Sequence, residues 1–351
     1  MSAHLDKPMI FFSFFMFTAD LRPDDADYAQ VVIHHMQALK DMGYDGFDLH
    51  IAPQLTLADC QAAVDSYARL KEKFDKAGLG DMAFSTNVGT TPNFDPTSPW
   101  QQQRDAALAY LKTRIDITAA LGEPAIMSGP FLYPYGAFPV TDLGTPLWSD
   151  ALLDWMEPRF ATAREPFVEL SAYAADKGVT LAIEPVKSWE TPPPNMVSQA
   201  LDFIESIDFS TVPGANCGVT VDTAQVVMES QGPQVFRDNI ERATRHERLH
   251  YVHVSAPDRG AVHDSWIPWE LMLDTIVPVF KGPWLVEVFN AVTPFDSSMR
   301  MGRQRFWRPG EDAPKEGVPS AYDIARAGLD TLRGQLAAAH QRQSALHNHH
   351  A

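Results

Sequence analysis

Four residues in the second half of the chain are of types that bind metal ions and move protons. They are Glu184 in VTLAIEPV, Asp222 in GVTVDT, His253 in LHYVHVSA and Glu287 in PWLVEVFN. Each follows or closes a short run of β-branched and apolar residues, the pattern of a buried strand. Three carboxylates with one imidazole suit Mn²⁺, Mg²⁺ or Co²⁺, whereas Zn²⁺ usually prefers more nitrogen or sulfur. If the four side chains converge, they predict a divalent-metal site that moves a proton next to a carbonyl group.

The elements that must position these residues alternate regularly along the chain. Eight short apolar runs each precede a longer amphipathic stretch, and several begin after a glycine that ends the preceding helix, such as Gly122 or Gly178. The expected strands cover residues 9–17, 46–51, 81–89, 124–130, 179–186, 217–223, 249–256 and 283–290. The amphipathic stretch 148–178 is expected to be a helix that breaks near Pro158 or Pro166.

This alternation predicts an α/β fold, a parallel sheet covered by helices. Eight units favour a single closed (β/α)8 TIM barrel over an open sheet, and no Gly-x-Gly-x-x-Gly follows a strand to support dinucleotide binding. Catalytic groups of such barrels come from the carboxyl ends of several strands. Neighbouring strands lie about 4.8 Å apart. The four residues, on strands five to eight, are therefore expected to meet over the barrel mouth.

The chain shows no linker rich in glycine or serine, so one domain is predicted. The barrel is expected over residues 1–343, with a long loop at 291–319 after strand eight and a disordered tail at 344–351. The loop is rich in arginine and aromatic residues, with Arg300, Arg303, Arg305, Phe306, Trp307 and Arg308. Such a segment can bind a phosphate or carboxylate, stack on an aromatic group, dock a second subunit, or be a solvated loop paired with local acids.

Composition limits the classes of partner. The 351 residues are 45% hydrophobic and carry a formal charge of −17, which repels nucleic acid and acidic membrane surfaces. Cys60 and Cys217 form no Cys-x-x-Cys pair, which favours a reduced, cytoplasmic protein. The apolar run MIFFSFFMF has no basic flank or cleavage site and is too short to span a bilayer. We therefore interpret it as a buried strand.

The motifs around the four residues resemble the xylose isomerase-like TIM barrels and, within them, the D-tagatose 3-epimerase-type sugar isomerases and epimerases. LAIEPVKSWE resembles that family's Glu-Pro strand with a second glutamate six residues on, here Glu184 and Glu190. HVSAPDRG, followed by IPW, resembles its strand-seven histidine with an arginine six residues later, here His253 and Arg259. VTVDTAQ and LVEVFN resemble its strand-six Asp-Thr and its last metal-binding glutamate. The resemblance is strong over Gly178–Asn290, and the first half shares only the general barrel pattern.

The resemblance implies an isomerase or epimerase that acts on a keto sugar through a metal-stabilised enediolate. One divalent ion, Mn²⁺ before Mg²⁺ or Co²⁺, would be held by Glu184, Asp222, His253 and Glu287. Glu184 and Glu287 would also be the acid and base on opposite faces of the substrate. Glu190 and Arg259 would bind sugar hydroxyls, and a homo-oligomer is expected.

Two departures from the family pattern concern substrate contacts. Three residues after the strand-six aspartate, where the epimerases carry a histidine, this chain has Gln225. A glutamine can hydrogen-bond a hydroxyl but cannot titrate near neutral pH. The insertion GAVHDSWIPW places His263 and Asp264 where they can reach the site, although loop histidines are often only surface groups.

Three alternatives stay open from the sequence. Subunits of C-glycoside-cleaving enzymes also resemble this chain near HVSAPDRG; such a lyase would act on 3-oxo-glycosides by β-elimination, with a small β-rich partner subunit. Related barrel nucleases use histidine-rich, multi-zinc centres, and the acidic charge and the few strand-end histidines count against them. A sugar-binding protein without activity would not need a carboxylate on each side of its ligand.

Overall fold

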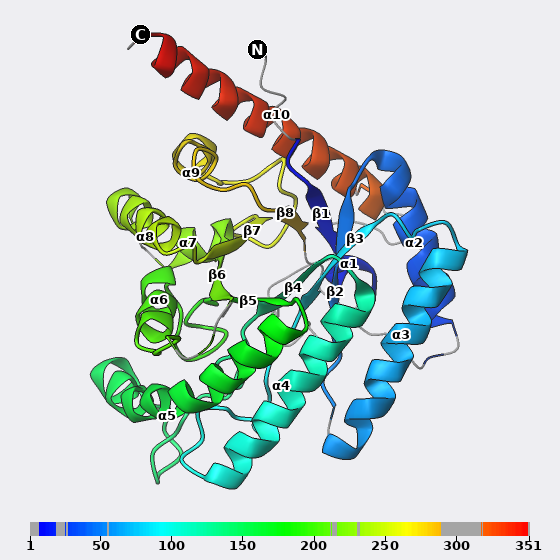
Figure 1. Cartoon of the computed structure of the whole chain (residues 1–351). Helices are drawn as coiled ribbons and strands as arrows, with labels where there is room; N and C mark the ends of the chain where they lie inside the picture. Colours follow the sequence, from blue (N-terminus) through cyan, green and yellow to red (C-terminus); the bar gives the residue numbers. More distant parts are fainter. Residues whose placement is uncertain are drawn as a thin grey trace.

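Eight parallel strands close into a barrel in the computed structural model (Figure 1). In chain order they are β1 Ile10–Ser13, β2 Gly46–His50, β3 Ala83–Asn87, β4 Pro124–Gly129, β5 Thr180–Ile183, β6 Cys217–Asp222, β7 Leu249–Ser255 and β8 Trp284–Glu287. Each strand pairs with its neighbour in sequence, and β1 also pairs with β8 to close the ring. The predicted (β/α)8 barrel is confirmed. The structure describes residues 7–18, 25, 27–54, 56–210, 212, 216–229, 232–288, 317 and 319–349.

Helices follow the strands and form the outer layer. They are α1 Phe15–Thr18, α2 Tyr28–Met42, α3 Cys60–Lys76, preceded by the 3-10 turn η1 Leu57–Asp59, α4 Gln101–Leu121, α5 Ser149–Asp176, α6 Val197–Glu205, α7 Thr223–Met228, α8 Pro233–Arg245, α9 Trp269–Ile276 and α10 Ala321–His349. The last helix packs beside α9 and α2 and covers β8, where the ring closes (Figure 1). Strands and helices therefore alternate along the chain, as a (β/α)8 barrel requires.

The core has two parts, because the side chains of a strand point alternately to its two faces. Outward-facing residues pack against the helices; Phe84 of β3, for example, stacks on Phe74 of α3 with ring centroids 5.5 Å apart. Inside the barrel, an apolar cluster fills the lower part of the lumen and consists of Phe11, Ile126, Ala182, Tyr251 and Leu285. The polar residues of the site lie further along the same inward faces.

Three sequence predictions differ from the structure. The apolar run 9–17 does not form one strand, since β1 ends at Ser13 and α1 begins at Phe15. The predicted break in the helix after strand four is wrong: α5 continues through Pro158 and Pro166, and its packing against α4 and β5 outweighs the two missing N–H donors. The predicted tail 344–351 is helical as far as His349.

Residues 289–316 lie outside the described part of the chain. The predictions for the loop 291–319, including those for Arg300, Arg303, Arg305 and Arg308, therefore stay predictions. Among the described residues, no helix has the length and apolar character needed to cross a membrane.

Candidate metal centre

The four candidate ligands meet at the carboxyl ends of β5 to β8. Glu184 follows β5 directly, Asp222 and Glu287 close β6 and β8, and His253 lies near the end of β7, paired in register with Asp222. One ligand atom from each residue lies within 4.8 Å of the others. All four side chains are buried. The convergence expected from the sequence is present.

Asp222 is the most firmly held of the four. Its Oδ1 accepts hydrogen bonds from the N–H groups of Ala224 and Gln225, at 2.6 and 3.1 Å, where α7 begins. The Ser255 hydroxyl lies 2.7 and 2.8 Å from the two carboxylate oxygens. Burial by itself would raise the pKa of Asp222, but the positive charges of Arg259 and His253 and these hydrogen bonds lower it. Asp222 is thus a firmly held, ionised carboxylate and a candidate metal ligand.

The pKa values of both His253 and Glu287 are raised in the buried cluster. The Nδ1 of His253 lies 3.4 Å from Glu184 Oε1 and 3.9 Å from Glu287 Oε1. Burial lowers the pKa of His253, but Glu184, Glu287 and Asp48 outweigh it and raise the value to about 9. Burial raises the pKa of Glu287 to about 8, against the opposing effect of Arg259 and His253. Crowded carboxylates that retain protons suit a divalent cation, which replaces those protons.

Glu184 is positioned by a close approach between strands. Its N–H donates to the carbonyl oxygen of Gly129, at the end of β4, with a distance of 3.0 Å. Gly129 has a φ of +122°, and a Cβ at this position would lie 2.3 Å from the Val88 carbonyl oxygen. Only glycine fits such a backbone. The contact therefore fixes the start of the segment that carries Glu184.

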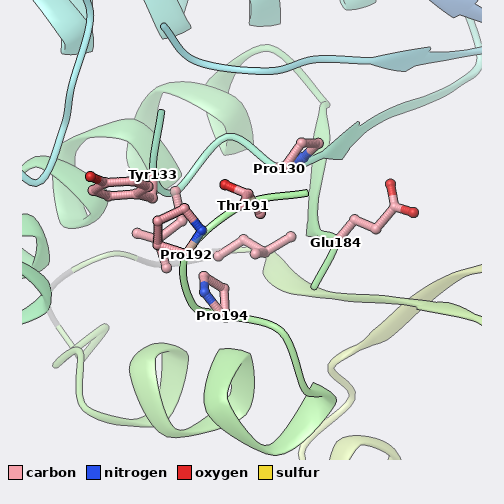
Figure 2. Close-up of a pocket in the computed structure, with 8 residues that line it drawn as sticks. Pro130, Tyr133, Glu184, Thr191, Pro192 and Pro194 are labelled. Atoms are coloured by element: carbon pink, nitrogen blue, oxygen red, sulfur yellow. The ribbon is translucent and has the colours of Figure 1, made fainter. Parts of the chain in front are cut away.

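A small, mainly apolar pocket lies beside the carbon chain of Glu184. Figure 2 shows that the carboxylate points away from this pocket. It is lined by Pro130, Leu132, Tyr133, Ile183, Glu184, Thr191, Pro192 and Pro194. The pocket thus lies next to the four candidate metal ligands, and of these four only Glu184 lines it.

The four predicted substrate contacts are placed differently in the structure. Arg259 is drawn into the cluster, with Nη1 3.4 Å from Asp222 Oδ2 and Nη2 3.1 Å from Glu287 Oε2. Its N–H donates to Ala256 in a turn where Arg259 itself has a φ of +59°. Gln225 is buried, and its Oε1 accepts a hydrogen bond from a backbone N–H at 3.0 Å.

Glu190 and His263 differ in how they are placed. Glu190 accepts a hydrogen bond at 3.1 Å from the hydroxyl of Tyr135, which belongs to the segment after β4. His263 is exposed in the turn after β7, and no contact among the described residues links it to the four ligands. The structure therefore brings Glu190, Gln225 and Arg259 into contact networks at the mouth, and it leaves His263 outside them.

Sequence reasoning missed a buried polar chain beneath the ligands. The Ser85 hydroxyl donates to Asp48 Oδ2 at 2.6 Å and lies 2.8 Å from the Tyr251 hydroxyl. The Tyr251 ring meets the His253 imidazole edge-on, with centroids 4.7 Å apart. The sequence contained one indication of this chain, because the alternation of side chains along a strand places Asp48 on the same face of β2 as Gly46 and His50. Lys187 was also missed, and no pattern in the sequence distinguishes it.

Comparison with known proteins places this fold and site in a family. A model of the family described as "Xylose isomerase-like TIM barrel" matches residues 36–316. The chain belongs to this family. The family resemblance predicted from the strand-end motifs is confirmed.

The relatives include sugar epimerases. A ketose 3-epimerase from Arthrobacter globiformis is 22% identical over 291 residues, which cover 81% of this chain and 87% of that protein. A crystal structure of a candidate sugar phosphate isomerase/epimerase from Anabaena variabilis is 44% identical, with a TM-score of 0.89 over 95% of this chain and 99% of that one. D-allulose 3-epimerase from Methylomonas sp. shares 19% identity and a TM-score of 0.70 over 94% of this chain and 99% of that one. None of these three is named as a lyase, so the β-elimination alternative gains no support from them.

Proposed function

We propose that this protein is a divalent-metal-dependent epimerase of a keto sugar that moves the proton on the carbon next to the carbonyl. One observation carries the proposal: Glu184 and Glu287 come from β5 and β8 and meet in one buried cluster with Asp222 and His253. Because β6 and β7 lie between those two strands, the two carboxylates approach the centre from different sides. The relatives named as 3-epimerases favour the third carbon as the reacting position.

The donor set fits a divalent cation. Three carboxylates and one imidazole suit Mn²⁺, and Mg²⁺ or Co²⁺ are alternatives. When bound, such an ion would stabilise the negative charge that develops on two neighbouring oxygens of the substrate. The same charge would offset the repulsion among Glu184, Asp222 and Glu287.

Inversion at a carbon needs a proton acceptor on one face and a proton donor on the other. Glu184 and Glu287 are proposed as this pair, each acting as acid in one direction of the reaction and as base in the other. In the metal-free protein burial raises the pKa of Glu287 to about 8, and a bound divalent cation would favour the ionised carboxylate that accepts the substrate proton. Arg259, 3.1 Å from its Oε2, restrains the carboxylate.

Sugar hydroxyls are proposed to bind around this pair. Glu190 would accept hydrogen bonds from hydroxyl groups, and the Arg259 guanidinium would donate them. Gln225 would contribute through its amide nitrogen, because its Oε1 is already occupied. His263 would contribute only if the turn that carries it moves toward the mouth on binding.

Exchange of substrate protons with heavy water tests the proposal. Protein loaded with Mn²⁺ is incubated in D₂O with D-fructose, D-tagatose, D-allulose and phosphorylated ketoses, and the sugars are analysed by NMR. The expected result is deuterium at one carbon beside the carbonyl together with the epimer of at least one sugar. Absence of exchange across all these sugars would overturn the proposal, and product aldose without epimer would replace it with isomerisation.

A further inference from the structure

The carboxylate of Glu190 is held from two different segments. Its Oε1 forms an ion pair with Lys187 Nζ, three residues earlier in the segment after β5. Its Oε2 accepts a hydrogen bond from Tyr135, in the segment after β4. The Lys187 side chain is 0% exposed and that of Glu190 is 10% exposed. Both oxygens of a nearly buried carboxylate are thus fixed before any ligand binds.

Hydrogen bonds to the backbone of Lys187 fix its position. Its N–H donates to Gln225 Oε1, and its carbonyl oxygen accepts from the N–H groups of Glu190 and Thr191, at 2.9 and 3.3 Å. The ammonium lies 4.5 Å from the ring centroid of Trp189. These backbone contacts do not depend on the Lys187 side chain, so a change of that side chain tests the ammonium alone.

A buried pair of this kind is a poor way to gain stability. Removing both charges from water costs as much as their attraction returns, or more. Burial, together with the positive charge of Arg259, lowers the pKa of Lys187. An ammonium has three N–H bonds, and the structure, where described, gives it one ion-pair partner, Glu190. Because burying this ion pair gives little or no net stability, its presence indicates a role in function.

We propose that Lys187 is a positioning residue that holds the Glu190 carboxylate in place to accept hydrogen bonds from the hydroxyls of the sugar. Tyr135 is the second support, from the neighbouring segment. The assignment rests on the proposed function, because it takes Glu190 as a substrate contact. It adds two residues that act through Glu190 and predicts that neither contributes to holding the metal ion.

A double-mutant cycle tests whether Lys187 acts through Glu190. In the Mn²⁺-loaded enzyme, Lys187→Met is expected to raise the KM for the best ketose about 10- to 100-fold, the usual effect of a hydrogen bond to a charged group. The kcat should change less than about threefold, because the reacting pair is untouched. In a Glu190→Gln background the same substitution should change KM less than about twofold. Equal effects in both backgrounds would overturn the proposal.

Two further measurements separate positioning from a general loss of structure. The Kd for Mn²⁺, from calorimetry, should not rise by more than about twofold, since Lys187 forms no ion pair with the four described ligands and the loss of its positive charge near Asp222 would favour a cation. A weakening of Mn²⁺ binding beyond about tenfold would contradict the assignment. Tyr135→Phe should raise KM by a smaller factor, about three- to tenfold, because it removes one neutral donor.

The surface offers a matched control. Lys112 pairs with Glu169 at 2.6 Å and lies 5.1 Å from the Tyr173 ring, a similar trio of lysine, glutamate and aromatic on the helical exterior. Lys112→Met should leave KM and kcat unchanged.

Crystal structures of the Lys187→Met variant add a measurement that needs no activity: the Glu190 carboxylate should leave its position. If the parent protein exchanges no protons but Glu190 moves, the proposed function fails and the support of Glu190 by Lys187 stands; if Glu190 stays in place, the positioning role is wrong.

Discussion

The two halves of the barrel present different chemistry at the same mouth. The strands β5 to β8 carry Glu184, Asp222 and Glu287 at or next to their last residue and His253 two residues before the end of β7, whereas β1 to β4 end in Ser13, His50, Asn87 and Gly129. Three carboxylates thus come from one half of the ring and, at the strand ends, none from the other. We propose metal binding and proton transfer for the second half, whereas the strand ends of the first half carry no carboxylate and its inward-facing carboxylate, Asp48, lies deeper in the barrel.

The first half supports the second from below. Its inward-facing carboxylate, Asp48, lies two residues before the end of β2 and accepts a hydrogen bond from Ser85 of β3. Ser85 contacts Tyr251 of β7 across the lumen, and Ser128 of β4 contacts Thr220 of β6 in the same way, at 2.7 Å. The barrel therefore carries its candidate metal ligands on four adjacent strands, and hydroxyls from β3 and β4 contact two of these strands, β7 and β6, across the lumen.

The largest expected effect comes from neutralising one of the proton-transferring carboxylates. Glu184→Gln or Glu287→Gln should lower kcat about 10³-fold or more, because general acid–base groups contribute about 10²- to 10⁴-fold and each glutamine also weakens a metal ligand. Asn87→Ala, at the mouth of the first half, should cost less than about tenfold in kcat. Proton exchange in D₂O measures both. A loss for Asn87→Ala as large as that for Glu287→Gln would break the division between the halves.

The sequence predicted strands in both halves of the barrel, but it predicted the buried polar residues of the second half far better than those of the first. Charged residues that close apolar runs are rare and specific, so Glu184, Asp222, His253 and Glu287 identified both their strands and their meeting point. Asp48 lies mid-strand; its partner Ser85 is 37 positions away, and the Tyr251 that Ser85 contacts is a further 166 positions along the chain, so only the closed ring brings the three together. The Lys187–Glu190 pair depends on a loop turn, which periodicity does not describe. The unbroken α5 shows tertiary packing overriding a local preference.

The second prediction concerns the competition between protons and the metal ion. The pKa values of Glu287 and His253 are raised to about 8 and about 9, so both groups hold protons at pH 7 in the metal-free protein. Binding of Mn²⁺ should then release about two protons, and the Kd should rise up to about 100-fold for each unit of pH decrease below 7. Calorimetry in buffers of different ionisation enthalpy counts the protons. Release of none would show that these two residues do not titrate with the ion.

The sign of the accompanying stability change follows from the same shifts. Both groups bind protons more tightly in the folded state than in the unfolded chain, where their usual values are 4.5 and 6.5. Their contribution to stability is therefore full at low pH and is lost as the pH rises through about 8 and 9. The rise in Tm on adding Mn²⁺ should consequently grow between pH 6 and pH 9, which thermal melts with Mn²⁺ or EDTA will show.

The third prediction tests the buried carboxylate of the first half. Burial raises the pKa of Asp48 to about 6, with His253 and Ser85 opposing the shift, so the proton it holds stabilises the fold fully below about pH 4 and is lost as the pH rises through 6. At pH 8, Asp48→Asn should therefore stabilise the metal-free protein by up to ~3 kcal/mol, with the gain shrinking toward pH 4. With Mn²⁺ bound nearby, the gain should also shrink, because the cation favours the ionised form. Destabilisation at pH 8 in EDTA would mean that Asp48 supports the second half as a charge.

The smallest effect is expected at His263, a residue that the sequence placed at the mouth. Because His263 is exposed and outside the contact networks of the described site, His263→Ala should change KM and kcat less than about twofold. Glu190→Gln, on the same sugars, gives the scale of a true hydroxyl contact. A rise in KM for His263→Ala comparable to that for Glu190→Gln would mean that the turn after β7 closes on the substrate. The sugar would then be held between this turn and the strand ends of the first half.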